Sequence, residues 1–420
     1  MRRLELLATL PFFFSLWGCV DEEPPVDPNT NNTQTDPDPD PDPDPDPADS
    51  LQFASPVTLL QVESNQRIAH GDVDGDGHLD FVVNPSESSL TWLKGDGQGN
   101  FGQAKVAWTD TALDAFVSEL YQWVCDDFDC ALDLVFLNRI DLADFNGDGK
   151  DELMASFSVI DEDSQYWSAV GVLDLNTQGA VPRILSADDG YVAAEVIADL
   201  DDDGGAEILI YTWHNSFLLR NGGEKSSEAF SVNVAGNYYP QSWTSDLDND
   251  GDLDILSFYN GGYGILGVTA FLRQEDGQFT ERIVDDEIFG HMAVGNGGAR
   301  TPATELMMAT SEAIFWVENG EQPTLFGALD FENLSPWGTV FGDFNGSGSL
   351  DLLSPQTEGT VGMAGDGEGG FDSIEVAAFE LNYEEVAADI NGDGLDDLYR
   401  IFWNAEQQVS QLEVILNESR

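Results

Sequence analysis

Short apolar runs alternate with polar, glycine-rich turns from about residue 53 to the end of the chain. In six places a polar loop leads directly into an apolar segment, such as Ile208–Tyr211 or Leu253–Phe258. Further apolar runs come later in the units, such as Leu90–Leu93, Phe271–Arg273 or Ile314–Val317. Runs of this length bounded by turn residues predict strands. Each unit is therefore predicted to hold four strands: one entering the loop, one leaving it and two more.

The loops recur at a regular spacing that predicts a propeller. Their first residues are at positions 72, 144, 199, 246, 343 and 389, and the interval of 97 residues is close to two of the others. A degenerate copy near residues 291–309 keeps Glu305 and fills that gap. Repeats of about 50 residues with four strands each are typical of propeller blades. We expect an all-β fold, a seven-bladed β-propeller of four-stranded antiparallel blades.

The last unit offers only three strands before Arg420. The unpaired segment Phe53–Val62 is similar to fourth strands elsewhere, such as Phe101–Trp108. We therefore expect this N-terminal strand to complete the last blade and close the ring, which would cover both sheet edges.

Each loop has nine residues and carries an oxygen-bearing side chain at positions 1, 3, 5 and 9. The six sets are Asp72, Asp74, Asp76, Asp80; Asp144, Asn146, Asp148, Glu152; Asp199, Asp201, Asp203, Glu207; Asp246, Asp248, Asp250, Asp254; Asp343, Asn345, Ser347, Asp351; and Asp389, Asn391, Asp393, Asp397. Position 7 is expected to offer its backbone carbonyl, from His78, Lys150, Gly205, Asp252, Ser349 and Leu395. Calcium takes six to eight oxygen ligands, and glycines allow the sharp turns needed to wrap it.

The pattern predicts five calcium sites and a weaker sixth, where Ser347 leaves only two carboxylates. Polar turns between strands are the alternative for any single copy, but six copies in register favour a metal. An EF-hand is excluded because it needs a glutamate at position 12, where the first copy has Val83. In the degenerate copy, Arg300 either takes the place of the cation beside Glu305 or is a free surface arginine.

These loops resemble the FG-GAP and VCBS repeats of integrin α-subunit-like β-propellers. The resemblance rests on Asp72-Val-Asp-Gly-Asp-Gly-His-Leu-Asp80 and Asp389-Ile-Asn-Gly-Asp-Gly-Leu-Asp-Asp397, and it covers residues 53–420. It implies a calcium-binding propeller whose fifth loop has lost its ligands.

The charge of the chain narrows the range of partners. Acidic residues number 79 against 15 basic ones, for a net charge of −64. Nucleic acids and anionic membrane surfaces need clustered lysine and arginine, so both are excluded as partners. Strong repulsion between copies also predicts a monomer.

The N-terminal residues predict export. Arg2 and Arg3 precede a short apolar stretch that ends at Cys19, too short to span a membrane. Residues 1–18 resemble a bacterial lipoprotein signal, which implies lipidation of Cys19 and an outer-membrane anchor; an ordinary secretory signal is the alternative. Residues 19–50 form an Asp/Pro-rich stalk, and residues 51–420 form the propeller.

An insertion at about residues 109–133 lengthens the first unit. Cys125 and Cys130 lie in it, and in an oxidising compartment they would form a small disulfide loop; two reduced thiols are the alternative. The apolar spacing from Leu113 to Tyr121 predicts a short amphipathic helix.

A ligand face is expected opposite the metal loops, where aromatic and histidine side chains gather on other connections. Its candidate residues are Trp213, His214, Tyr238, Tyr239, Trp243, Tyr259, Trp337 and Trp403, although each of them can instead pack between blades. Nucleophile, zinc-protease and phosphate-loop motifs are missing from the sequence, so we expect no enzyme. The predicted function is binding or adhesion to a protein or glycan; the alternatives are a catalytic propeller acting on polysaccharide and a purely structural envelope protein.

Overall fold

The structure is a computed structural model, and its described residues all belong to one compact unit, Asp46–Arg420. The described residues are 50–63, 67–86, 89–108, 118, 132–161, 166–177, 183–189, 192–201, 203–212, 216–220, 224–230, 241–247, 250–260, 265–274, 277–289, 293–296, 305–309, 314–318, 324–325, 338–356, 359–366, 371–377, 379, 381, 385–405 and 407–419. Over these residues, no helix has the length and apolar character that crossing a membrane requires.

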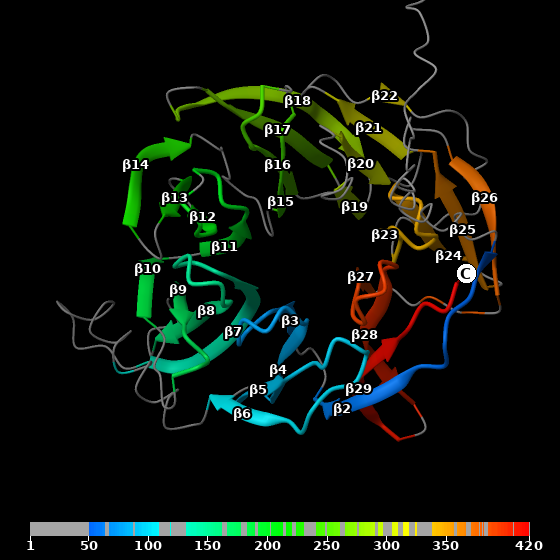
Figure 1. The fold of residues 1–420 in the computed structure, drawn as a ribbon. Coiled ribbons are helices and arrows are strands. Elements are labelled where there is room, and N and C mark those ends of the chain that lie inside the picture. Colours follow the sequence, from blue (N-terminus) through cyan, green and yellow to red (C-terminus); the bar gives the residue numbers. More distant parts are fainter. Residues whose placement is uncertain are drawn as a thin grey trace, which may run out of the picture. The chain divides into compact units, whose positions relative to one another are not determined.

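Five sheets in the described part of the chain are regular blades, each built from four consecutive antiparallel strands (Figure 1). They are β3 (Ile68–Gly71), β4 (Asp80–Ser86), β5 (Ser89–Leu93) and β6 (Lys105–Trp108); β7 (Leu132–Ala143), β8 (Glu152–Asp161), β9 (Tyr166–Leu173) and β10 (Arg183–Asp189); β11 (Val192–Ile197), β12 (Glu207–Thr212), β13 (Ser216–Arg220) and β14 (Glu224–Phe230); β15 (Gln241–Ser245), β16 (Asp254–Asn260), β17 (Ile265–Arg273) and β18 (Phe279–Phe289); and β19 (Ala293–Asn296), β20 (Glu305–Ala309), β21 (Ile314–Glu318) and β22 (Thr324–Leu325).

Two further sheets combine C-terminal strands with strands from the N-terminal end. In one, β23 (Val340–Gly342), β24 (Asp351–Gln356), β25 (Gly359–Gly365) and β26 (Phe371–Val376) are joined by β1 (Ser50–Leu51). In the other, β27 (Val386–Ala388), β28 (Asp397–Asn404) and β29 (Val409–Ile415) are joined by β2 (Val57–Val62). The β1 strand pairs in parallel with β26, whereas β2 pairs antiparallel with β29.

The expectation of seven regular four-stranded antiparallel blades is therefore wrong, because the described residues form five such blades and two composite sheets. The expected strand over Phe53–Val62 is also interrupted. Phe53 forms only an isolated bridge with Asn417, and β2 begins at Val57. The physical reason is that the N-terminal segment first covers the edge of β26 as β1 and only then crosses to β29.

The sheets follow one another around a common centre. The first strand of each sheet contacts the first strand of the next, from β3 to β7 and onward to β27. Contacts between β2 and β4 connect the last sheet with the first. These contacts make the fold an all-β, propeller-like arrangement (Figure 1).

The hydrophobic core lies between neighbouring sheets. For example, Phe145 packs with Ile208 of the next sheet, and Leu353 packs with Leu398. Phe81 and Tyr399 join the first and last sheets, with ring centroids 4.9 Å apart. Residues on β4, β8, β12 and β24 are buried in unbroken runs, which is why these second strands are apolar rather than alternating.

Several expectations fall on residues outside the described part. Cys19, the signal and the stalk lie there, as do Cys125 and Cys130. Within residues 109–131 of the insertion only Ser118 is described, and it is helical. These expectations stay predictions.

Candidate metal loops

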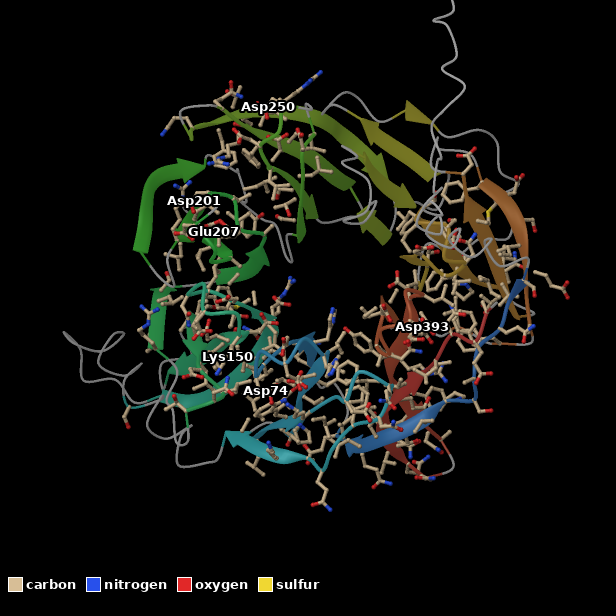
Figure 2. The ribbon with its side chains drawn as sticks, viewed as in Figure 1. Asp74, Lys150, Asp201, Glu207, Asp250 and Asp393 are labelled. Atoms are coloured by element: carbon tan, nitrogen blue, oxygen red, sulfur yellow. The ribbon has the colours of Figure 1, made fainter. Side chains whose placement is uncertain are left out.

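Each candidate loop connects the first strand of a sheet to the second, so the loops lie at corresponding ends of their sheets (Figure 2). We number them by unit: loop 1 (Asp72–Asp80), loop 2 (Asp144–Glu152), loop 3 (Asp199–Glu207), loop 4 (Asp246–Asp254), loop 6 (Asp343–Asp351) and loop 7 (Asp389–Asp397). Loop 5 belongs to the degenerate copy, of which only the strand β20 with Glu305 and the strand β19 are described. Arg300 lies outside the described residues.

The carboxylate at position 9 is buried and accepts a hydrogen bond from the backbone N–H at position 2. This bond is present in all six loops: Val73 to Asp80 (3.2 Å), Phe145 to Glu152 (3.0 Å), Leu200 to Glu207 (2.6 Å), Leu247 to Asp254 (2.8 Å), Phe344 to Asp351 (2.9 Å) and Ile390 to Asp397 (3.0 Å). The side chain at position 2 is buried in every copy. Position 2 therefore anchors the loop in the core while its N–H holds the carboxylate.

Where position 9 is aspartate, its second oxygen accepts a hydrogen bond from a backbone N–H at the end of the third strand or within two residues after it. The donors are the backbone N–H groups of Gly95, Arg273, Gly365 and Asn417, at distances of 2.8, 2.7, 3.0 and 2.7 Å. One carboxylate thus links the start of the loop to the end of the third strand. Sequence reasoning missed this link because the donors are backbone groups and carry no side-chain signal.

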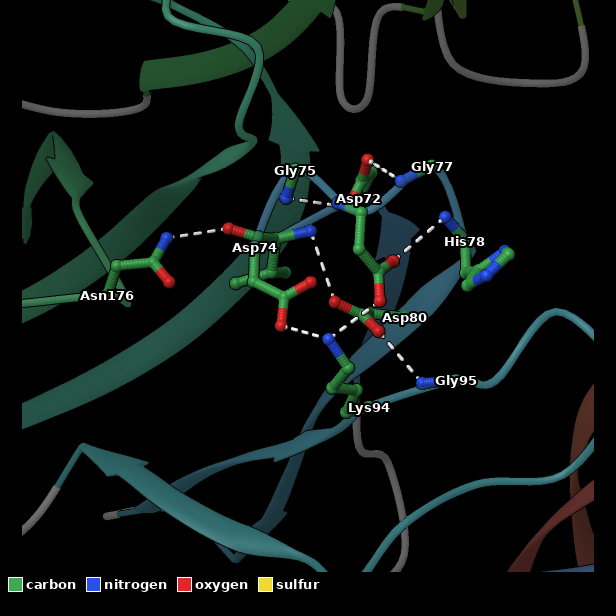
Figure 3. Close-up of polar contacts among 11 residues, drawn as sticks. Asp72, Asp74, Gly75, Gly77, His78, Asp80, Lys94, Gly95 and Asn176 are labelled. Atoms are coloured by element: carbon green, nitrogen blue, oxygen red, sulfur yellow. Dashed lines mark hydrogen bonds and ion pairs between the residues drawn. The ribbon is translucent and has the colours of Figure 1, made fainter.

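The carboxylate at position 1 closes the loop on itself. In loop 1, Asp72 accepts hydrogen bonds from the N–H groups of Gly75, Asp76 and Gly77 at 2.8, 3.0 and 2.7 Å (Figure 3). Gly75 and Gly77 have φ of 77° and 83°, in the left-handed region that only glycine enters without cost. Loops 2 and 7 repeat these bonds through Asp144 and Asp389.

Position 5 also bonds within the loop. Its side-chain oxygen accepts the N–H of position 7 in every copy, at 3.0–3.2 Å: His78, Lys150, Gly205, Asp252, Ser349 and Leu395 donate. The expectation that position 7 offers its carbonyl to a metal stays a prediction. Asp248, at position 3 of loop 4, lies outside the described residues.

Loop 3 has the donor set that fits a hard cation best. One ligand oxygen from each of Asp199, Asp201, Asp203 and Glu207 lies within 4.8 Å of the others. Glu207 is fully buried, and its Oε1, like Oδ1 of Asp201, has no hydrogen-bond partner among the described residues. Buried carboxylate oxygens left without a partner are costly. A divalent cation among these four side chains would satisfy them, so the residues present fit Ca²⁺.

Three loops also have a basic side chain beside them. In loop 1, Lys94 Nζ contacts Asp74 Oδ2 and lies 2.7 Å from Asp76 Oδ2 (Figure 3). Arg220 Nη1 lies 3.4 Å from Asp201 Oδ2 in loop 3, and Arg273 Nη1 lies 3.6 Å from Asp252 Oδ1 in loop 4. Hydrogen bonding to Lys94 lowers the pKa of Asp76. The ammonium of Lys94 therefore occupies the side of loop 1 where two predicted ligands converge.

Burial raises the pKa of five of the carboxyl groups at position 9. The pKa of Asp80 is raised to about 6, and those of Glu152, Glu207, Asp351 and Asp397 to about 7. Desolvation is the largest cause in each case, and neighbouring loop carboxylates raise the values further. The hydrogen bonds from position 2 act in the opposite direction but do not outweigh burial.

The predicted ligand face is described at only a few positions. Trp403 is 49% exposed near the end of β28, the strand end opposite loop 7. Trp243 and Tyr259 lie on β15 and β16. The remaining candidates lie outside the described residues: Trp213, His214, Tyr238, Tyr239 and Trp337.

Comparison with known proteins supports the fold and leaves the family open. No protein-family model and no curated protein matches the chain. A crystal structure of BBS1N in complex with ARL6DN, soaked with lead, is similar over 87% of this chain and 97% of that chain, with 10% identity and a TM-score of 0.50. A second crystal structure of that complex, soaked with mercury, covers 87% and 96% with 10% identity and a TM-score of 0.48. This likeness shows a propeller fold; the resemblance to FG-GAP and VCBS repeats stays a prediction.

The raised pKa of Glu207 predicts how stability depends on pH in chelator. A folded pKa of about 7, above the ordinary 4.5, means that protonation favours the folded state. The contribution of this protonation to the free energy of unfolding is complete below about pH 4.5 and is lost as the pH rises through about 7. Glu207→Gln, which mimics the protonated group, is expected to stabilise the chelated protein at pH 8 by about 1–2 kcal/mol, discounted for solvent near the loop.

Urea unfolding from pH 5 to 8 measures this difference, which is expected to shrink toward pH 5. Glu375→Gln, on the exposed side of β26, is the matched control. A Glu207→Gln variant less stable than wild type at pH 8 in chelator would contradict the assignment.

Proposed function

We propose that this protein is a calcium-stabilised propeller that acts as an extracytoplasmic binding module for a protein partner. The observation that carries the proposal is the donor set of loop 3, where buried oxygens of Asp201 and Glu207 lack partners among the described residues. Five further loops repeat the same position 9 bond. Calcium would supply a fixed positive charge there; the protein oxygens would hold it and keep the loops closed.

A protein partner is supported by the fold and by the surface away from the loops. BBS1N, the similar propeller at a TM-score of 0.50, was crystallised in complex with another protein. In this chain, Trp403 offers a large exposed aromatic surface, a kind of side chain enriched at recognition surfaces. The metal loops lie at one end of the sheets and Trp403 lies near the opposite end, so metal binding and partner binding would occupy different surfaces.

Export and anchoring form the second part of the proposal. The signal-like residues 1–18 and the Asp/Pro-rich residues 19–50 support a propeller held away from a membrane by an extended tether. We propose that Cys19 carries the lipid and that the outer membrane is the destination.

Replacing Cys19 tests this anchor. Cys19→Ser is expected to abolish acylation, since serine cannot form the thioether, and to release the protein into the soluble fraction. Intact mass and detergent partitioning of wild type and variant measure the change. A wild-type protein cleaved near residue 19 without added lipid mass would indicate an ordinary secretory signal instead.

Removing the amine of Lys94 tests cation binding in loop 1. Lys94→Met removes an ammonium that competes for Asp74 and Asp76, so calcium is expected to bind loop 1 about two- to fivefold more tightly. Isothermal titration calorimetry measures the affinity, with Lys105→Met, whose amine lies over the Trp92 ring, as control. An unchanged or weaker affinity in the Lys94 variant would show that loop 1 does not take calcium through these carboxylates.

Binding arrays test the proposed role. The protein is expected to be retained on a protein target in calcium but not after chelation, and Trp403→Ala is expected to weaken retention at least about tenfold, as for an aromatic hot spot. The melting temperature checks that Trp403→Ala leaves the fold intact, and Val57→Ala, also exposed, serves as control. Retention on glycans alone, or turnover of a polysaccharide without retention, would contradict the proposal.

A further inference from the structure

Neighbouring metal loops are bonded to each other through position 8. The backbone N–H of Asp151, at position 8 of loop 2, donates to the carbonyl of Asp72, at position 1 of loop 1, at 2.9 Å. Asp396 of loop 7 donates to the carbonyl of Asp343 of loop 6 in the same way, at 3.0 Å. Ala206 of loop 3 donates to Asp144 of loop 2 at 2.7 Å. This backbone bond therefore recurs at three junctions between consecutive units.

At two of these junctions a carboxylate adds a second bond. Asp151 Oδ2 accepts the N–H of Asp72 at 2.6 Å, and Asp396 Oδ2 accepts the N–H of Asp343 at 2.7 Å. Position 1 is thus held through both its N–H and its carbonyl by the following unit. At the third junction Ala206 has no side chain that could do this.

The residue before position 1 varies together with position 8 of the next loop. It is Gly71 opposite Asp151 and Gly342 opposite Asp396, but Ala143 opposite Ala206. A Cβ on Gly71 would collide with Asp151 Oδ2 and lie 2.9 Å from Leu142 Cβ, and one on Gly342 would lie 2.8 Å from Asp396 Oδ2 and 2.9 Å from Phe344 Cζ. Glycine at these two positions therefore leaves room both for the carboxylate of the following unit and for a second neighbouring side chain.

We infer that Asp151 and Asp396 are positioning residues. They fix the first cation ligand of the preceding unit, which is Asp72 for Asp151 and Asp343 for Asp396. Cation binding in loops 1 and 6 therefore depends on the next unit. The inference rests on the proposed calcium binding. Partners of metal ligands set ligand orientation, and losing one commonly costs about 10–100-fold in affinity. Neither carboxylate needs to touch the ion.

The test compares calcium binding by wild type, Asp151→Ala and Asp151→Asn, using isothermal titration calorimetry. Asp151→Ala is expected to weaken one site about tenfold or more. Asp151→Asn keeps an oxygen that can accept the N–H of Asp72, so it is expected to retain most of the affinity. Asp372→Ala, at an exposed position of β26, is the charge-matched control and is expected to leave all affinities unchanged.

Two further measurements separate positioning from folding. In chelator, Asp151→Ala is expected to show the same circular dichroism spectrum as wild type while its calcium titration still shows the weakened site. With Asp76→Ala, which removes the ligand oxygens at position 5 of loop 1, Asp151→Ala is expected to have no further effect on calcium binding.

The inference is overturned if Asp151→Ala leaves every calcium affinity within about twofold of wild type, or if its effect is as large in the Asp76→Ala background. It is also overturned if Asp151→Asn loses as much affinity as Asp151→Ala. Wild-type protein that takes up no calcium would instead refute the proposed function itself, before any variant is compared.

Discussion

A buried carboxylate at the end of each loop is the interaction on which the rest of the structure depends. A carboxylate removed from water must be hydrogen-bonded or it destabilises the fold. Asp80, Asp254, Asp351 and Asp397 meet this requirement with two backbone N–H groups, one from position 2 and one from the end of the third strand or just after it. The bonds fix where the loop begins and where the third strand ends, so loop geometry and sheet geometry are set together.

The same arrangement concentrates negative charge in each loop. The loops differ in which basic side chains lie beside these carboxylates. In loop 1, Lys94 contacts two carboxylates and leaves Asp74 Oδ1 without a partner among the described residues. In loop 3, Arg220 lies beside Asp201, and Glu207 Oε1 has no such partner. In a chain with a net charge of −64 this difference matters, because each added cation relieves repulsion locally. The loops are therefore not equivalent sites, although their sequences are repeats.

The sequence predicted what is local and periodic. The loop positions, the apolar second strands and the all-β class follow from a pattern that recurs along the chain, and the β12 and β16 strands match the expected segments closely. Pairing between distant segments carries no such pattern. The two-residue strand β1 pairs with β26, which lies near the other end of the chain, and this broke the expected regularity of the blades. Lys94 was missed for the same reason, since it lies outside the nine-residue motif.

Contacts across the chain ends show why the composite sheets form where they do. Glu418 N–H donates to the carbonyl of Gln52 at 2.7 Å, Gln52 N–H donates to Ser419 Oγ at 2.9 Å, and Ala54 N–H donates to the carbonyl of Leu416 at 2.8 Å. Asn417, buried between these segments, also bonds Asp397 of loop 7. Asn417 thus takes part both in the contacts between the two chain ends and in the hydrogen bond to the position 9 carboxylate of loop 7. Because closing a long loop costs entropy that only specific contacts offset, the last metal loop and the joining of the two ends stabilise each other.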